Sequence, residues 1–303
     1  MKLPLWLTGS LACLALAAPA ADKLPVVASF SILGDLVSQV GGDKVEVRTL
    51  VGPDGDAHVY QPSPRDGKTL AGARLLVTNG LGFEGWMERL ITASRYRGAR
   101  VVASDKIQAE QMAEDEGHEH GHGHDHGKLD PHAWQDPARV QQYVANIADG
   151  LAAADPANAT YYRQRAVQYR QTLQQLDSWA QQQFASVPSA KRRVITSHDA
   201  FGYLGRHFGI TFLAPQGMNT EAEASAKAVG QLIQQAKREG IRAIFVENIS
   251  NPRLLEQISR ETGAKPGGRL YSDALSRPDG PAASYEAMMR YNIATLVAGM
   301  KQN

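Results

Sequence analysis

The chain has 303 residues, 43% of them hydrophobic and 21% charged, and a formal net charge of +1. This length allows a sizeable hydrophobic core and two domains. The balance of 32 basic against 31 acidic residues argues against nucleic acid or an anionic membrane surface as a partner.

The first 21 residues are typical of a signal peptide. Lys2 precedes an apolar segment that is interrupted at residues 8–10, and Ala18-Pro19-Ala20 suits signal peptidase. The segment is too short and too interrupted for a membrane span, and no later run of about 18 apolar residues follows it. We therefore expect an exported and soluble mature chain.

The only cysteine, Cys13, lies inside this segment. Acylation of Cys13 would make the protein a lipoprotein, but Ser10 is a poor residue three positions before an acylated cysteine, and the apolar run continues past it. A processed chain then has no thiol, which excludes disulfides and thiolate metal sites. Any metal must therefore take nitrogen and oxygen ligands.

Residues 22–154 predict an N-terminal α/β lobe. Helix-like segments, such as Ile32 to Val40 before Gly41-Gly42, alternate with short β-like runs. These runs are VVASF, VEVRTLV, LLVTNG and RVVAS.

A histidine-rich loop is predicted over residues 113–128 of this lobe. Its histidines alternate with Gly, Glu and Asp, which form no core and predict a mobile, solvated segment. Ordering such a segment costs about 1–2 kcal/mol per residue, so any zinc captured there should be held weakly. The alternatives are a tolerated surface insertion and, disfavoured by the internal position, an affinity tag. The loop histidines are His118, His120, His122, His124 and His126.

One long helix is predicted over residues 155–187. Asp155-Pro156 resembles an N-cap with proline in the first helical position, and no further Pro or Gly occurs before Pro188. About 30 residues at 1.5 Å each give roughly 45 Å, enough for a stiff connection along both lobes, although an ordinary buried helix is the alternative. Its predicted buried face consists of Tyr162, Ala166, Tyr169, Leu173, Leu176 and Ala180.

Residues 188–303 repeat the α/β pattern and predict a C-terminal lobe. Helical stretches are expected around residues 200–207, 222–239 and 251–262. The β-like runs are RRVIT, ITFLA, AIFVEN and RLYSD.

Four isolated residues are candidates for one metal site. His58 lies in a Gly- and Pro-rich loop past VEVRTLV, His198 follows RRVITS, and Asp273 ends RLYSD, while His132 lies in LDPHAWQDP. Ligands gather beyond the carboxyl ends of strands in an open α/β sheet, so these residues can converge. Each residue alone is weak support, and their spacing forms no local zinc signature. Together they suggest a metal held between two lobes.

Four ordered motifs, GPDGDAHVYQPSP, LDPHAWQDP, TSHDAFGYL and GRLYSDALS, resemble those of a known family. This family is the zinc- and manganese-type solute-binding proteins of ABC importers, often called cluster A-I and including the ZnuA type. The resemblance covers essentially the whole mature chain. It implies two α/β lobes with four-stranded, mostly parallel sheets flanked by helices, one rigid linker helix, and one metal between the lobes.

The resemblance places the family's ligands on His58, His132, His198 and Asp273. Manganese members usually carry glutamate where this chain has His198, and imidazole suits zinc whereas manganese favours oxygen-rich sites. A tetrahedral Zn²⁺ site is therefore expected, with manganese as the alternative. Nearby residues that could orient the ligands, or merely cap loops and pack the core, are Asp130, Trp134, Asp136, Asp199 and Glu247; His207 is expected near a helix end rather than in the site.

The predicted function is a periplasmic, monomeric zinc-binding protein that delivers Zn²⁺ to a membrane ABC permease with its cytoplasmic ATPase. A periplasmic zinc chaperone is a further possible partner of the histidine-rich loop. A zinc hydrolase is a weaker alternative, because four protein ligands fill the shell that a catalytic zinc keeps open for water. A surface adhesin or metal buffer is the third alternative.

Overall fold

The computed structural model describes residues 22–111 and 129–303. The predicted signal peptide with Cys13 and the predicted histidine-rich loop with its five histidines lie outside the described residues. Within the described ranges, no helix combines the length and the apolar character that a membrane span requires.

The first lobe is built on a parallel sheet of four strands in the order β2-β1-β3-β4. Its central strands are nearly continuous apolar runs because helices cover both faces of the sheet. The strands are β1 (Leu24–Phe30), β2 (Val45–Val51), β3 (Leu75–Thr78) and β4 (Ala99–Val102). The helices are α1 (Ser31–Gly41), α2 (Pro64–Ala71), α3 (Met87–Ser94) and α4 (Pro137–Ala154).

The second lobe repeats this arrangement with the strand order β6-β5-β7-β8, again parallel. The predicted fold class, two α/β lobes with four-stranded parallel sheets flanked by helices, is thereby confirmed. The strands are β5 (Arg193–Ile195), β6 (Thr211–Leu213), β7 (Ile244–Glu247) and β8 (Pro266–Leu270). The helices are α6 (Gly202–Phe208), α7 (Ala226–Glu239), α8 (Arg253–Thr262) and α9 (Tyr285–Met300).

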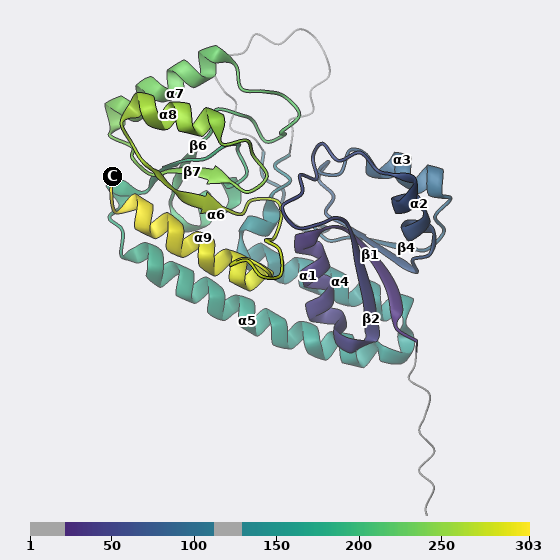
Figure 1. The fold of residues 1–303 in the computed structure, drawn as a ribbon. Helices are drawn as coiled ribbons and strands as arrows, with labels where there is room; N and C mark the ends of the chain where they lie inside the picture. The colour runs from purple at the N-terminus through teal and green to yellow at the C-terminus, as the bar shows by residue number, and fades with distance from the viewer. Residues whose placement is uncertain (1–21, 112–128) are drawn as a thin grey trace, which may run out of the picture.

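Helix α5 (Ala159–Ala185) runs beneath both lobes (Figure 1). It packs against α1 and α4 of the first lobe and against α9 of the second. All six residues of its predicted apolar face are buried, as is Phe184. At 27 residues it is about 40 Å long.

The start of α5 differs from the prediction. A 3-10 turn (Pro156–Asn158) precedes the α-helix, which begins at Ala159. The Asp155 carboxylate does not cap the helix backbone, because its Oδ2 accepts hydrogen bonds from Asn158 Nδ2 and Tyr162 Oη, both at 2.7 Å. The Asp155 carboxylate therefore binds one side chain of the 3-10 turn and one inside the first turn of α5.

The end of β8 also differs from the predicted run RLYSD. The strand ends at Leu270 because Asn292 of α9 binds both backbone groups of Tyr271, accepting from its N–H at 2.9 Å and donating to its carbonyl at 2.7 Å. Tyr271 is thereby removed from the sheet ladder. Asp273 consequently lies in the loop beyond the strand.

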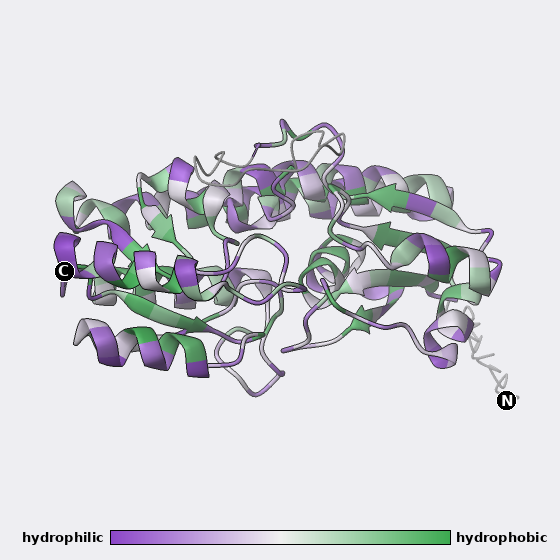
Figure 2. Ribbon diagram, turned by 90° about the horizontal axis from the view of Figure 1, so that it is seen from above, coloured by the Kyte–Doolittle hydropathy of each residue, from purple (hydrophilic) through white to green (hydrophobic). Residues whose placement is uncertain are grey.

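The two lobes share one hydrophobic core. A single cluster of buried side chains extends from β1 and α1 through Trp134 and Phe184 to Tyr285 on α9. A separate, smaller cluster lies between α7, α8 and strands β5 and β7. Figure 2 shows this distribution, with mainly hydrophobic strands inside and more polar helices outside. The lobes are thus packed against each other as well as linked by α5.

Candidate metal centre

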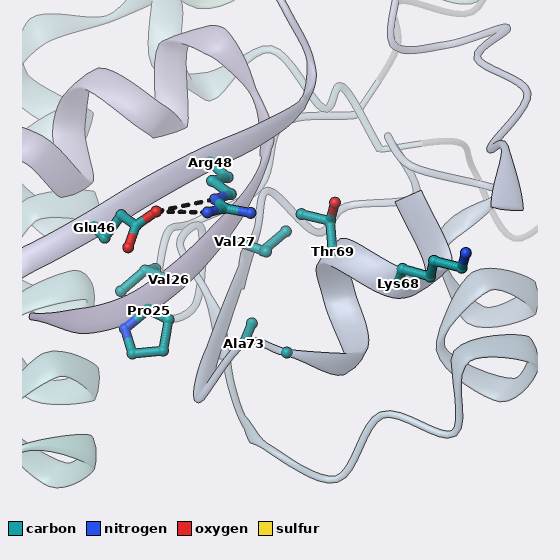
Figure 3. A pocket seen from close by; sticks show the side chains of 9 residues that line it. Pro25, Val26, Val27, Glu46, Arg48, Lys68, Thr69 and Ala73 are labelled. Atoms are coloured by element: carbon teal, nitrogen blue, oxygen red, sulfur yellow. Dashed lines mark hydrogen bonds and ion pairs between the residues drawn. The ribbon is translucent and has the colours of Figure 1, made fainter. Parts of the chain in front are cut away.

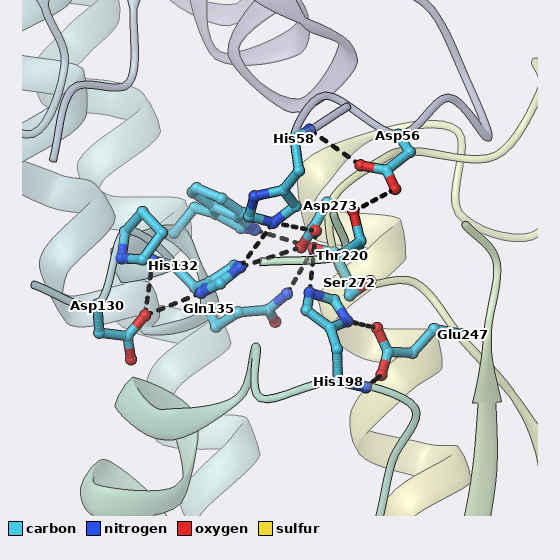
Figure 4. A network of polar contacts seen from close by, with 12 residues as sticks. Asp56, His58, Asp130, His132, Gln135, His198, Thr220, Glu247, Ser272 and Asp273 are labelled. Atoms are coloured by element: carbon cyan, nitrogen blue, oxygen red, sulfur yellow. Dashed lines mark hydrogen bonds and ion pairs between the residues drawn. The ribbon is translucent and has the colours of Figure 1, made fainter. Parts of the chain in front are cut away.

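The four predicted ligand residues meet between the lobes (Figure 4). His58 comes from the loop after β2, His132 precedes a 3-10 turn (Ala133–Gln135), His198 follows β5, and Asp273 follows β8. Their donor atoms all lie within 4.8 Å of one another. Each lobe contributes two of the four side chains.

The donor atoms lie close enough together to share one cation. Asp273 Oδ2 lies 3.1 Å from His58 Nε2 and 3.2 Å from His198 Nε2. His132 Nε2 lies 3.3 Å from His58 Nε2 and 3.8 Å from Asp273 Oδ1. Zinc–ligand bonds of about 2.1 Å at tetrahedral angles place neighbouring donors about 3.4 Å apart. The four donors therefore fit around one small cation with little rearrangement.

The donors are removed from water. The side chains of His132, His198 and Asp273 are fully buried, and that of His58 is 3% exposed. Among the described residues, five buried polar atoms at this site have no properly aligned hydrogen-bond partner. His198 Nδ1 and Glu247 Oε2 face each other as an ion pair, whereas His198 Nε2 and both carboxylate oxygens of Asp273 face the cluster. Buried polar atoms without partners are costly, so their convergence on one point fits a bound cation.

Asp130 holds His132 in place. Its Oδ1 accepts hydrogen bonds from the backbone N–H of His132 and from the ring Nδ1, both at 2.9 Å. A proton on Nδ1 leaves Nε2 as the free lone pair directed at the other donors. Of the two roles considered for Asp130, the structure assigns it contact with the imidazole.

Glu247, at the end of β7, holds His198 through its backbone and faces its ring as an ion pair. Its Oε1 accepts from the backbone N–H groups of Ser197 at 2.8 Å and His198 at 2.9 Å. Its Oε2 lies 2.5 Å from His198 Nδ1. The carboxylate thus fixes both the backbone turn after β5 and the orientation of the ring.

The charges around the site act on its pKa values. Burial alone would lower the pKa of His198, but the carboxylates of Glu247 and Asp273 raise it well above its usual value. Burial alone would raise the pKa of Asp273, but the His198 and His132 imidazoles hold it well below its usual range. A protonated His198 and an ionised Asp273 stabilise each other when no metal is bound.

The segment around His132 is held against the second lobe by the candidate Trp134 and by Gln135 and Tyr285, which the sequence did not single out. Gln135 Nε2 and Trp134 Nε1 both donate to the carbonyl of Ser272, at 2.6 and 2.9 Å. Tyr285 Oη donates to the Trp134 carbonyl at 2.8 Å. Because Ser272 precedes Asp273, these bonds fix two ligands from different lobes relative to each other.

Three remaining candidates do not lie among the donors. Asp136 caps α4 through the backbone N–H of Ala138, and its carboxylate also contacts His207 Nδ1 at 2.8 Å and Arg139 Nε at 3.6 Å. His207, in the last turn of α6, also contacts Asp177 on α5 at 2.9 Å. Asp199 lies next to His198 in sequence, and burial raises the pKa of its carboxyl. His207 therefore links helices rather than joining the metal centre.

A separate cavity of about 150 Å³ lies at the amino ends of the first lobe's strands (Figure 3). Its lining includes residues 25–27, Ala73 and the pair Glu46 and Arg48. Arg48 is bound to Glu46 through two nitrogens, at 2.7 and 3.1 Å. This pairing satisfies the charges at the cavity wall, and the metal centre lies at the opposite ends of the strands.

Comparison with known proteins decides the family. A family described as "ZnuA: Zinc-uptake complex component A periplasmic" matches residues 26–299. The chain belongs to the ZnuA family. It is an exported solute-binding component of a metal ABC importer, whose family works with a permease and an ATPase, and it is not an enzyme.

ZnuA-family relatives carry the names of several metals. The manganese-binding lipoprotein MntA of Halalkalibacterium halodurans is 31% identical over 281 residues, covering 93% of this chain and 90% of the relative. The iron-binding protein YfeA of Yersinia pestis is 30% identical, covering 93% and 88%. Relatives of known structure agree with the fold described above.

Two solved structures illustrate this agreement. The periplasmic zinc-binding protein TroA of Treponema pallidum has a TM-score of 0.84 at 28% identity, covering 92% of this chain and 99% of TroA. The manganese-bound periplasmic metal-binding protein of Candidatus Liberibacter asiaticus has a TM-score of 0.81 at 30% identity, covering 92% and 100%. Membership of the ZnuA family thus establishes a divalent metal as the cargo. It does not specify which metal, because the relatives are named for manganese, iron and zinc.

Proposed function

We propose that this protein captures Zn²⁺ between its lobes and delivers it to the permease of a zinc-uptake ABC importer. The observation that supports this most strongly is the cluster of His58, His132, His198 and Asp273 at tetrahedral spacing. In this proposal, three imidazoles and one carboxylate form the complete ligand set.

The donor set favours zinc over manganese. Imidazole nitrogen suits zinc, whereas manganese prefers oxygen-rich sites of higher coordination number. Here three of the four donors are nitrogen, and His198 occupies the position at which manganese members of the resembled family usually carry glutamate. The manganese and iron names of the relatives make manganese the alternative cargo.

The processing and organisation of the chain form the second part of the proposal. We infer a periplasmic monomer without its first 21 residues, with lobes at residues 22–154 and 188–303 and a linker over residues 155–187. Relatives such as MntA are named lipoproteins, so acylation at Cys13 is the alternative, which the poor context of Ser10 disfavours. The histidine-rich loop is a weak accessory zinc site, or a receiver of zinc from a chaperone.

Metal selectivity tests the proposal. The purified, metal-stripped protein should bind one Zn²⁺ tightly in a competition titration with a chromogenic chelator. His198→Glu should weaken zinc binding and strengthen manganese binding, because it replaces nitrogen by oxygen. Gln171→Glu, which adds a carboxylate at an exposed position of α5, is the control.

Uptake is tested separately in cells. Deletion of the gene should impair growth at limiting zinc, and a plasmid with the intact gene should restore it. Growth limited by manganese instead, together with manganese in the protein as isolated, would overturn the zinc assignment. If the deletion strain grew as well as the wild type at limiting zinc, a metal buffer would be favoured over a transport protein.

A further inference from the structure

The three histidines of the cluster are not held equally. The second ring nitrogen of His132 faces Asp130 at 2.9 Å, and that of His198 faces Glu247 at 2.5 Å. Among the ion pairs of the described residues, none joins a carboxylate to Nδ1 of His58, and the one ion pair of its ring joins Nε2 to Asp273. Among the described residues, His58 is therefore the ligand histidine whose second ring nitrogen faces no carboxylate.

The position of His58 depends on its loop instead. Asp56 Oδ1 accepts the backbone N–H of His58 at 2.9 Å, and Asp56 Oδ2 accepts the hydroxyl of Thr220 at 2.6 Å. One carboxylate thus connects the backbone of a first-lobe ligand to a side chain of the second lobe. Figure 4 shows both contacts of Asp56 on the outer side of the cluster.

Thr220 is itself fixed beside another ligand. Gln216 Nε2 donates to the carbonyls of Thr220 at 3.0 Å and Ala222 at 2.7 Å. Gln216 in turn forms a parallel bridge with His198. A chain of contacts thus runs from His58 through Asp56, Thr220 and Gln216 to His198.

We propose that the Asp56–Thr220 hydrogen bond is a clasp that retains the metal by holding His58 in place, so that Thr220 is a positioning residue for metal release. This rests on the proposed function, because it assumes that the four-residue cluster holds zinc. The side chains of His132, His198 and Asp273 are fully buried, whereas that of His58 is 3% exposed, so departure of the His58 loop is the inferred release route. This departure would also break the hydrogen bond from Trp86 Nε1 to the Ala57 carbonyl, at 2.7 Å. Opening the clasp frees the loop and removes one ligand.

A second contact keeps the loop folded when the clasp is absent. The backbone N–H of Asp54 donates to the carbonyl of Leu275 at 2.9 Å, and Asn248 Nδ2 donates to Asp54 Oδ1 at 3.0 Å. These bonds do not involve Thr220. Loss of the Thr220 hydroxyl should therefore speed metal release without unfolding the loop.

Rapid mixing of the zinc-loaded protein with excess chelator tests the clasp. Thr220→Val removes the hydroxyl at nearly constant shape and should release zinc about tenfold faster, because a hydrogen bond to a charged group is lost at a partly exposed position. Thr220→Ser keeps the hydroxyl and should restore the wild-type rate. Thr211→Val, the same change at an exposed position on β6, is the matched control and should also release zinc at the wild-type rate.

The outcomes distinguish a failure of the clasp proposal from a failure of the proposed zinc-binding function. Equal release rates for wild type and Thr220→Val, or equally fast release from Thr220→Ser, would overturn the clasp. The metal-free melting temperature of Thr220→Val should match wild type, and a large fall in it would reduce Thr220 to a structural residue. A wild-type protein that retains no zinc would overturn the proposed function itself, and the clasp with it.

Discussion

Replacement of Glu247 by Gln tests most directly how this carboxylate controls the zinc affinity of His198. Glu247 is 1% exposed and faces His198 Nδ1 at 2.5 Å, while its other oxygen accepts two backbone N–H groups. Gln has nearly the same shape and can keep those backbone bonds through its amide oxygen. Its amide nitrogen would then face the protonated Nδ1 that a zinc-bound His198 requires, so two donors would oppose each other.

The size of the effect follows from the bond that is lost. A hydrogen bond to a charged group contributes about 1.5–3 kcal/mol, which corresponds to roughly 10- to 150-fold in affinity. Loss of a partner that orients a metal ligand typically costs about 10- to 100-fold. We therefore expect Glu247→Gln to weaken zinc binding by about 10- to 100-fold at pH 8.

The loss should shrink as the pH falls. In the metal-free protein Glu247 and Asp273 raise the pKa of His198, and zinc can bind only after this proton leaves. Wild-type affinity must therefore decline as the pH falls through that raised pKa. In Glu247→Gln one of the two raising charges is gone, so the proton competes less and the decline begins at a lower pH.

Competition titrations with a chelator of known pH dependence, from pH 8 to pH 5.5, would measure both effects. Glu256→Gln, an exposed change on α8 of the same lobe, controls for the loss of a charge. An unchanged zinc affinity in Glu247→Gln, or a loss of the same size at every pH, would refute this account of the His198–Glu247 pair.

Other perturbations have equally direct outcomes. His132→Ala should reduce zinc affinity by orders of magnitude, whereas deletion of residues 117–127 should leave one tight site. Calorimetry on both variants measures this. Loss of tight binding in the deletion variant would contradict the assignment of the tight site to the four-residue cluster. Trp134→Ala should lower the free energy of unfolding by about 3–5 kcal/mol in urea titrations, because it empties a fully buried site between the lobes. His207→Ala should destabilise the protein more at pH 5.5 than at pH 9. The two aspartate partners of His207 raise its pKa in the folded protein. The stability that His207 contributes is therefore complete below the unfolded-state pKa of about 6.5 and is lost as the pH rises through the folded-state pKa. Equal destabilisation of His207→Ala at both pH values would argue against this charge effect.

Local patterns predicted the elements of the fold well, because strand and helix periodicity is a property of neighbouring residues. The buried face of α5 followed from steps of three and four residues, and strand ends located three of the four cluster residues. Yet the Asp-Pro signal was interpreted at residues 155–156, where Asp155 binds side chains instead of capping. The same signal at Asp136-Pro137 does begin a helix, the 18-residue α4, and there Asp136 caps it.

The contacts between lobes could not be predicted in this way. Thr220 meets Asp56 across 164 positions of sequence, and Gln135 meets Ser272 across 137. No periodicity links residues so far apart, and neither Thr220 nor Gln135 belongs to a residue type that chemistry singles out. Only the folded chain pairs them.

The hydrophobic core that continues from one lobe into the other constrains how the importer recognises its cargo carrier. Swinging the halves apart would expose Trp134 and Tyr285 to water, which makes a wide hinge opening energetically unfavourable. The metal-loaded and metal-free proteins should therefore have nearly the same overall shape. The permease must then discriminate between them by the order of a few surface loops, above all the one that carries His58.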